Sequence, residues 1–422
     1  MKVLQINAVN SLSSTGRTVS ELAVGLEARG IESRIAYSAG PAPEHGYLVG
    51  TPLEKKRHAL GSRLAGRQAY FSKRGTRGLL RYIEAEAPDV VHLRNLHGNY
   101  INLPMLLSYL GERDIPTVVN LDDCWYFTGK CCHYTIDGCY RWETGCGSCP
   151  RLHKDNPSWF FDRSAEMWAD KKRLFEAIPR LGVIGVSDWI TAEAERSYLS
   201  SASIVRRIYN WVDLDIFKPS PMHEARQRLG FPLNGTIVLG VASGWSDAKG
   251  LGDFNQLAER VIAGLTDFGV NSVGATTSTP VFIVLVGGVG KRSSVSPHID
   301  IAGKTHDVKQ LADYYSAADV FLQLSPEETF GKVTAEALAC GTPAVVYDST
   351  ANPELIRSGC GYVVDRGDLF QVLSRISRIV SEGKQQYSER CRWFAESQFD
   401  KESLIDEHVA LYQELCLLSG RA

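Results

Sequence analysis

The apolar positions of this chain fall into short continuous runs separated by stretches of helical period. Val19, Leu22, Ala23 and Leu26 mark one face of such a helix. The runs themselves are short, β-branched and largely apolar, which is typical of buried parallel strands. They predict strands at Val3–Ile6, Ile35–Tyr37, Asp89–Leu93, Thr117–Val119 and Val183–Val186 in the first half, the last of these closing that half, and at Ile237–Val241, Val281–Val286, Ile299–Ala302, Val320–Leu324 and Ala344–Tyr347 in the second.

This alternation predicts the α/β class with two doubly wound, Rossmann-like domains, since 422 residues exceed the usual single domain. The segment between the two series carries turn residues and ends in two prolines, so we interpret it as a crossing between domains. The predicted division is an N-terminal domain of residues 1–207 with a cysteine-rich insertion at 124–150, a crossing at 208–220, a C-terminal domain of 221–398, and a final helix at 399–422 that packs back on the N-terminal domain.

Composition narrows the classes of partner and location. The formal net charge is −2, which argues against nucleic acid as a partner. No segment approaches the roughly 18 uninterrupted apolar residues of a membrane-spanning helix. The N-terminal apolar run is too short for a secretory signal. We therefore expect a cytoplasmic protein.

One stretch departs from this even charge. From Lys55 to Ile83 there are nine Lys or Arg residues and no acid, with leucine and aromatic residues between them. A solvated basic face is the simpler interpretation. The alternative is a basic amphipathic surface that rests on an anionic membrane at the inner face of the cell.

The cysteines gather in one place, because six of the ten fall between Cys124 and Cys149. In a reducing compartment this favours metal binding, or thiols used as small hydrophobic groups, over a disulfide framework. The best ligand set for a structural zinc is Cys131 or Cys132 together with Cys139, Cys146 and Cys149. An iron–sulfur cluster is the alternative occupant.

The segment from Ser325 to Pro343 carries the clearest candidate site. Glu328 and Glu336 stand eight positions apart, and the pattern predicts a helix that begins near Phe330 or Gly331. On a helix they would lie about 80° apart around the axis and roughly 12 Å apart along it, so they can meet the two ends of an extended ligand. The helix start would offer unpaired N–H groups to that ligand. A surface helix with two acids is the plainer alternative.

Several motifs resemble those of one enzyme family. They are the Glu-x7-Glu block from Glu327 to Asp348, an N-x-V-D-x-x-x-F-x-P crossing from Asn210 to Pro219, the pair Lys249-Gly250, the run Tyr314 to Phe321, and the cysteine block from Thr128 to Pro150. Together they resemble the retaining GT-B glycosyltransferases of glycosyltransferase family 4, of the exopolysaccharide or colanic-acid type. The resemblance covers nearly the whole chain.

This resemblance implies a function. The enzyme would transfer a hexose from a nucleotide diphosphate sugar, with UDP favoured over GDP, to a glycan or lipid-linked acceptor in cell-surface polysaccharide synthesis. The N-terminal domain would face the acceptor, the C-terminal domain would bind the donor across a cleft, and no cofactor would be required for catalysis. Two alternatives stay open: a non-catalytic scaffold that binds sugar nucleotides, and a nucleotide-sugar epimerase of the same fold.

The resemblance also implies roles for single residues. Glu336 would accept hydrogen bonds from the ribose hydroxyls, Glu328 would face the donor sugar, and Lys249 would hold the diphosphate. The implied catalytic set is Asp122, Glu328 and His97, and the implied donor-binding set is Gly16, Arg17, Lys249, Thr329, Phe330, Gly331, Lys332 and Glu336.

The chain departs from the family pattern at three positions. Gly244 stands where the family usually has an arginine, Asp122 where it has histidine, and Arg94 where relatives tend to carry histidine. These departures keep the scaffold alternative open. The missing positive charge at the first position has three candidate replacements, which are Arg17, Lys332 and Lys304.

Overall fold

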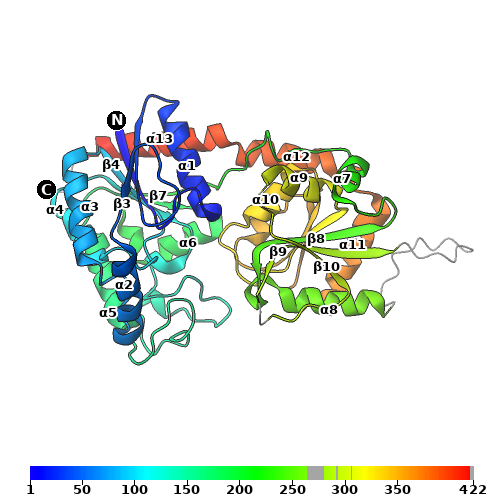
Figure 1. Ribbon diagram of the computed structural model, residues 1–422, viewed down its shortest axis with the longest axis horizontal. Helices are drawn as coiled ribbons and strands as arrows, with labels where there is room; N and C mark the ends of the chain where they lie inside the picture. The colour runs from blue at the N-terminus through cyan, green and yellow to red at the C-terminus, as the bar shows by residue number, and fades with distance from the viewer. Residues whose placement is uncertain (264–279, 291–292, 306, 419–422) are drawn as a thin grey trace, which may run out of the picture. The chain divides into compact units, whose positions relative to one another are not determined.

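A computed structural model describes residues 1–263, 280–290, 293–305 and 307–418 (Figure 1). By its internal contacts the chain separates into two compact units. Unit 1 consists of Met1–Ile208 with Glu402–Ala422, and unit 2 is Tyr209–Lys401. Unit 1 is therefore built from both ends of the chain, whereas unit 2 is continuous.

Unit 1 contains a seven-stranded parallel sheet in the order β3-β2-β1-β4-β5-β6-β7. Its strands are β1 Lys2–Ile6, β2 Glu32–Tyr37, β3 Gly46–Leu48, β4 Val90–Leu93, β5 Thr117–Leu121, β6 Leu181–Gly185 and β7 Ile204–Arg207. The strand order reverses between β1 and β4, and in doubly wound folds ligands bind at the carboxyl ends beside such a reversal. The prediction that Val183–Val186 closes this half is wrong, because β7 follows it, and the sequence also missed β3. Both are short strands at the edges of the sheet, and neither forms a continuous apolar run.

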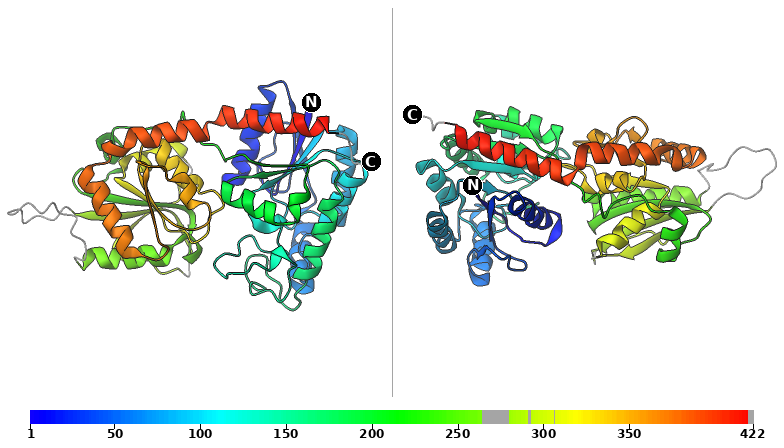
Figure 2. Two further views of the ribbon diagram at one scale, coloured as in Figure 1. Left: turned by 180° about the vertical axis from the view of Figure 1, so that it is seen from behind. Right: turned by 90° about the horizontal axis from the view of Figure 1, so that it is seen from above.

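The helices of unit 1 are α1 Ser13–Glu27, α2 Pro52–Ala65, α3 Lys73–Glu86, α4 Leu103–Glu112, α5 Ser164–Glu176, α6 Asp188–Arg196 and α13 Lys401–Leu417, with short 3-10 turns η1 Cys124–Tyr126, η2 Arg141–Glu143 and η3 Tyr198–Ser201. Figure 2 shows α13 lying along unit 1. A Cβ on Gly25 of α1 would lie 2.3 Å from Ile405 Cδ1 of α13, so the glycine permits the two helices to approach closely. Residues 419–422 of the predicted final helix lie outside the described residues.

Unit 2 contains a six-stranded parallel sheet in the order β10-β9-β8-β11-β12-β13. Its strands are β8 Thr236–Trp245, β9 Val281–Val289, β10 Ile299–Gly303, β11 Val320–Gln323, β12 Ala344–Tyr347 and β13 Gly361–Val364. Its helices are α7 Met222–Leu229, α8 Leu251–Ile262, α9 Val308–Ala317, α10 Lys332–Ala339, α11 Leu369–Glu382 and α12 Gln385–Phe399, with 3-10 turns η4 Asp247–Lys249 and η5 Asn352–Leu355. The predicted class of two Rossmann-like α/β domains is confirmed, although β13, at the sheet edge, was not predicted.

A buried lysine closes the end of α9 in unit 2. Lys384 Nζ donates hydrogen bonds to the carbonyl oxygens of Ser316 and Ala318, both at 2.8 Å, and of Tyr315 at 3.3 Å. The last carbonyls of a helix have no partner within the helix, so the ammonium group satisfies them. Burial lowers the pKa of Lys384 from its ordinary 10.5 to about 8.

This lowered pKa makes stability depend on pH. Below about pH 8 the fold carries the full cost of a buried charge, and the cost disappears as pH rises toward the unfolded pKa, because the native state then binds fewer protons. We expect the unfolding free energy of the wild type, relative to Lys384→Met, to rise by about 2 kcal/mol between about pH 7.5 and about pH 9.5. Urea unfolding measures this difference. Lys309→Met, at an exposed position of α9, is the control, and a difference constant across pH would contradict the prediction.

Candidate functional site

The carboxyl ends of β8 and β11, which are neighbours in the sheet of unit 2, carry two charged side chains that meet. Lys249 Nζ lies 2.5 Å from Glu328 Oε1. Lys249 ends η4 after β8, and Glu328 lies in the turn after β11. Their side chains are 37% and 16% exposed, so this ion pair is open to exchange with a ligand. The structure therefore brings together the two residues implied for the diphosphate and the donor sugar.

The helix expected to begin near Phe330 or Gly331 begins at Lys332, after Gly331. Glu328 therefore lies before the helix, and the expected spacing of both glutamates along one helix is wrong. Gly331 has φ +88°, a left-handed conformation that strains residues with a side chain, which explains the glycine at this turn. Phe330 is buried, and its ring centroid lies 5.6 Å from those of Tyr209 and Phe399. Its side chain thus belongs to the core, and only its backbone is placed to serve a ligand. Thr329 beside it is also buried.

The second glutamate has different surroundings. Glu336 is only 2% exposed, and it accepts a hydrogen bond of 3.0 Å from the Tyr315 hydroxyl. The two glutamates of the motif are therefore unlike each other, since one is paired with a lysine near solvent and the other is buried beside a tyrosine. Lys332, in the first turn of the same helix, is half-buried.

Gly244, where the family pattern has an arginine, faces Gly288 in the register of β8 and β9. Two of its candidate replacements lie in different units: Lys304 is exposed after β10 of unit 2, and Arg17 is half-buried in α1 of unit 1.

Gly16, of the implied donor-binding set, lies in the first turn of α1. Its carbonyl accepts a 3.0 Å hydrogen bond from the Ser11 amide, which folds the loop back on the helix. A Cβ on Gly16 would lie 3.1 Å from that amide nitrogen and 3.2 Å from Val9 Cγ2. The glycine thus permits the tight approach of the loop that follows β1.

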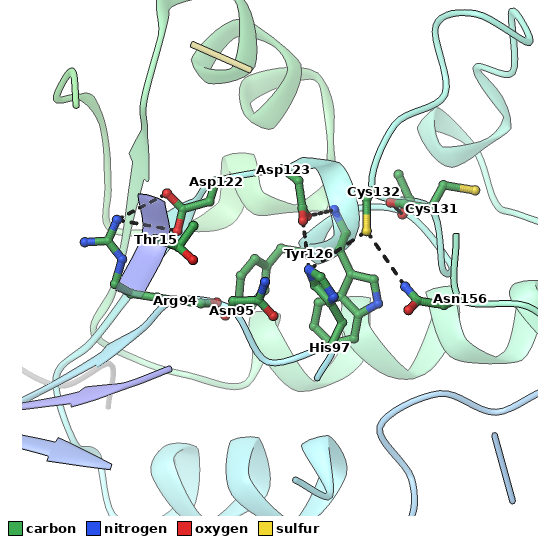
Figure 3. Close-up of polar contacts among 12 residues, drawn as sticks. Thr15, Arg94, Asn95, His97, Asp122, Asp123, Tyr126, Cys131, Cys132 and Asn156 are labelled. Carbon is green, nitrogen blue, oxygen red and sulfur yellow. Dashed lines mark hydrogen bonds and ion pairs between the residues drawn. The ribbon is translucent and has the colours of Figure 1, made fainter. Parts of the chain in front are cut away.

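Two of the three departures from the family pattern prove to be one interaction. Arg94 follows β4, Asp122 follows β5, and Arg94 Nη2 lies 3.2 and 3.4 Å from the two carboxylate oxygens of Asp122 (Figure 3). Asn120 Nδ2 donates a third hydrogen bond to this carboxylate at 2.9 Å. Arg94 is 1% exposed and Asp122 13%, so the charge pair is almost fully buried. The two positions therefore hold one buried pair of opposite charges.

The third catalytic candidate, His97, pairs with the next carboxylate. Its Nε2 lies 2.8 Å from Asp123 Oδ2, while Asp123 Oδ1 accepts a hydrogen bond of 2.8 Å from the Trp125 amide. Burial raises the pKa of Asp123, but His97 and the Trp125 amide outweigh this effect, so the pKa lies below its usual value. The Asp-Asp dipeptide after β5 was the sequence signal for Asp123, although only Asp122 belonged to the implied catalytic set.

The four predicted zinc ligands are neighbours without forming a compact set. The Cys131 thiol donates to Cys149 and lowers the pKa of Cys149 to about 7. Cys146 Sγ accepts a hydrogen bond of 3.2 Å from the Gly129 amide, and Cys139 is half-buried. Across the described ranges, the group of three potential ligands whose donor atoms lie within 4.8 Å of one another is His97, Asp123 and Cys132. A metal at the four-cysteine set stays a prediction.

Comparison with known proteins places both units in one class. Residues 15–216 match the family described as Glycosyltransferase Family 4, and residues 291–397 match Glycosyl transferases group 1. A protein of Escherichia coli (strain K12) named "Putative colanic acid biosynthesis glycosyl transferase WcaC" is 24% identical over 342 residues, which are 78% of this chain and 77% of that one.

Solved structures share the fold. Sucrose-phosphate synthase from Thermosynechococcus elongatus aligns with a TM-score of 0.68 at 18% identity, over 98% of this chain and 99% of that one. HepE from Anabaena, solved in complex with UDP, aligns with a TM-score of 0.66 at 15% identity, over 98% and 100%. The two family matches and the solved structures together give this chain the fold of GT-B glycosyltransferases of the group 1 and family 4 type. This is the class that the sequence motifs predicted.

The buried charge pair of unit 1 yields a stability prediction. Asp122→Asn leaves the Arg94 guanidinium buried without its counter-charge and should lower the unfolding free energy by about 3 kcal/mol. Arg94→Gln should cost a similar amount. The double variant should cost less than the sum, by about 1 kcal/mol or more, because the two side chains share one interaction. Urea unfolding of all four proteins measures this coupling, and strictly additive losses would show that the pair is not formed.

Proposed function

We propose that this protein is a retaining hexosyltransferase that moves a sugar from a UDP-sugar to a hydroxyl of a glycan or lipid-linked acceptor in cell-surface polysaccharide synthesis. The observation that carries the proposal is the Lys249–Glu328 ion pair beside the start of α10. A cation, a carboxylate and a helix N-terminus together suit a sugar diphosphate. The name of the E. coli relative supports a role in polysaccharide synthesis, and the complex of HepE with UDP supports UDP as the nucleotide of the donor.

In this proposal the ion pair opens when the donor binds. Lys249 releases Glu328 and pairs with the diphosphate, and the backbone amides of the turn at Gly331 donate hydrogen bonds to the nucleotide sugar. Glu328 then accepts hydrogen bonds from the hydroxyls of the sugar, and Glu336 accepts hydrogen bonds from those of the ribose. Lys249 and the helix N-terminus stabilise the negative charge that grows on the leaving phosphate, so this step needs no metal ion.

The reaction breaks the bond between the anomeric carbon and the phosphate oxygen and forms a bond from that carbon to the acceptor oxygen. Retention follows if the acceptor attacks from the face that the phosphate leaves. The acceptor proton then passes to the departing phosphate oxygen, so atoms and charge balance. Asp122, held by Arg94, is assigned to orient the acceptor hydroxyl or to stabilise positive charge on the sugar. His97 is assigned to position this region through Asp123.

Ligand binding tests the donor site. UDP should raise the melting temperature of the wild type more than GDP or ADP does, because a ligand of the native state stabilises it. Lys249→Ala should weaken UDP binding by about 10-fold or more, since it removes a charge-assisted contact. Lys218→Ala, an exposed lysine of the same unit, is the control. A UDP affinity equal in all three proteins would contradict this donor site.

Turnover separates the enzyme from the scaffold alternative. Purified wild-type protein should release UDP from a UDP-hexose in the presence of acceptor extract, and Glu328→Gln should slow this release while the protein still melts cooperatively. Nucleotide binding with no release of UDP from any UDP-hexose would instead support the scaffold.

Unit 1 also has a surface suited to a membrane, and we propose that it rests on anionic lipid. None of the described helices has the length and apolar character needed to cross a bilayer. Leu60 and Leu64 of α2 are nonetheless 48% and 41% exposed among the basic residues of 55–83, and Leu53, just before this segment, is 56% exposed. The nearby residues 159–161 form an exposed aromatic segment, tied to α2 by a 2.8 Å hydrogen bond from the Trp159 amide to the Arg63 carbonyl. Exposed apolar groups among basic ones suit an anionic membrane surface.

Vesicle sedimentation tests this surface with a matched pair of variants. Phe160 in unit 1 and Phe370 in unit 2 are each 66% exposed. Phe160→Ser should reduce recovery on vesicles containing phosphatidylserine several-fold, whereas Phe370→Ser should leave recovery unchanged. Equal recovery of wild type on neutral and anionic vesicles would contradict the proposal.

A further inference from the structure

We infer that His97, Asp123 and Cys132 form a binding site for a divalent transition-metal ion, and that zinc is the ion their donors suit. In Figure 3 the three side chains converge from different parts of unit 1. His97 Nε2 lies 2.8 Å from Asp123 Oδ2 and 3.9 Å from Cys132 Sγ. All three donor atoms lie within 4.8 Å of one another.

The donor set selects the class of metal. Magnesium and calcium take oxygen ligands, whereas an imidazole nitrogen, a carboxylate oxygen and a thiolate sulfur suit zinc. Tetrahedral zinc with bonds of about 2.0–2.3 Å requires about 3.3–3.6 Å between ligand atoms. The nitrogen–oxygen distance of 2.8 Å would have to widen and the nitrogen–sulfur distance of 3.9 Å to shorten, each by about half an ångström or less. Small side-chain rotations supply such shifts. The two anionic ligands would also neutralise the charge of the ion.

Surrounding groups hold the ligands in place. The Trp125 amide fixes the carboxylate of Asp123 through its other oxygen at 2.8 Å. Asn156 Nδ2 lies 3.8 Å from Cys132 Sγ and acts as a weak donor to it. The Cys124 amide donates to the Cys132 carbonyl at 2.9 Å, which ties the cysteine-rich segment to the end of β5. Outer contacts of this kind orient metal ligands in proteins.

The site is separate from the four-cysteine set. Cys131 and Cys132 are adjacent, but their sulfur atoms point in different directions, and that of Cys132 faces His97 (Figure 3). Cys131 instead contacts Cys149. The two cysteines that the sequence offered as alternatives for one ligand position therefore have different neighbours.

Three protein ligands leave one coordination position for a small molecule, as in catalytic zinc sites. His97 and Asp123 are 20% and 17% exposed, so a hydroxyl group or water can reach the ion. Asp123 directly follows Asp122, the residue assigned to the acceptor. If the protein transfers a sugar as proposed, the fourth ligand is a hydroxyl of the acceptor, which the ion would bind and orient.

Metal content tests the site without donor or acceptor, so its failure leaves the sugar-transfer proposal standing. We expect full-length protein purified without chelator to carry zinc, and Cys132→Ser and His97→Gln to lose one equivalent per chain. Cys416→Ser, a half-buried cysteine elsewhere in unit 1, should keep it. Thermal melts and circular dichroism of each variant show whether it is folded.

Cobalt substitution gives a second readout. Cobalt-loaded wild type should show thiolate-to-metal charge-transfer absorption that Cys132→Ser loses and Cys146→Ser retains. Loss in Cys146→Ser with retention in Cys132→Ser would place the metal on the four-cysteine set and overturn the inference. Wild-type protein that is folded and takes up no zinc during titration would overturn it as well.

Discussion

Parallel strand pairing is the constraint on which both units depend. Because every strand in a sheet runs the same way, all carboxyl ends lie along one edge, and the loops there bring together residues far apart in sequence. Lys249 and Glu328 meet in this way although 79 positions separate them, and Arg94 and Asp122 although 28 do. The chemistry of both units thus follows from strand direction and strand order, and the loops supply only the side chains.

Buried charge is the second recurring theme, and each instance is compensated differently. Arg94 faces a carboxylate, whereas Lys384 faces three carbonyl groups at a helix end. A buried ion pair contributes little net stability but is costly to break, so such pairs specify which side chains can be exchanged together. The buried pair of Arg94 and Asp122 is of this kind. A single change toward histidine at either position would leave the other charge buried alone.

The sequence predicted the class of fold, most strands and, to within two residues, the start of the helix near Gly331, because these depend on local periodicity and on one glycine. It missed β3, β7 and β13, which are short strands of three or four residues at the edges of the sheets. It treated Arg94 and Asp122 as separate departures, because a contact between two loops leaves no trace in spacing. For the same reason it did not connect His97 with Asp123 and Cys132, which are brought together only by folding.

The return of α13 to unit 1 bears on the order in which the chain can fold. Unit 2 is one continuous segment and has all its residues once Lys401 has been synthesised. The first segment of unit 1 is made before unit 2, but Ile405, Leu411 and Tyr412, which are buried in unit 1, are made only after it. Domains generally fold as units during synthesis. Here the part made first must therefore wait with an uncovered apolar face while the part made later completes its core.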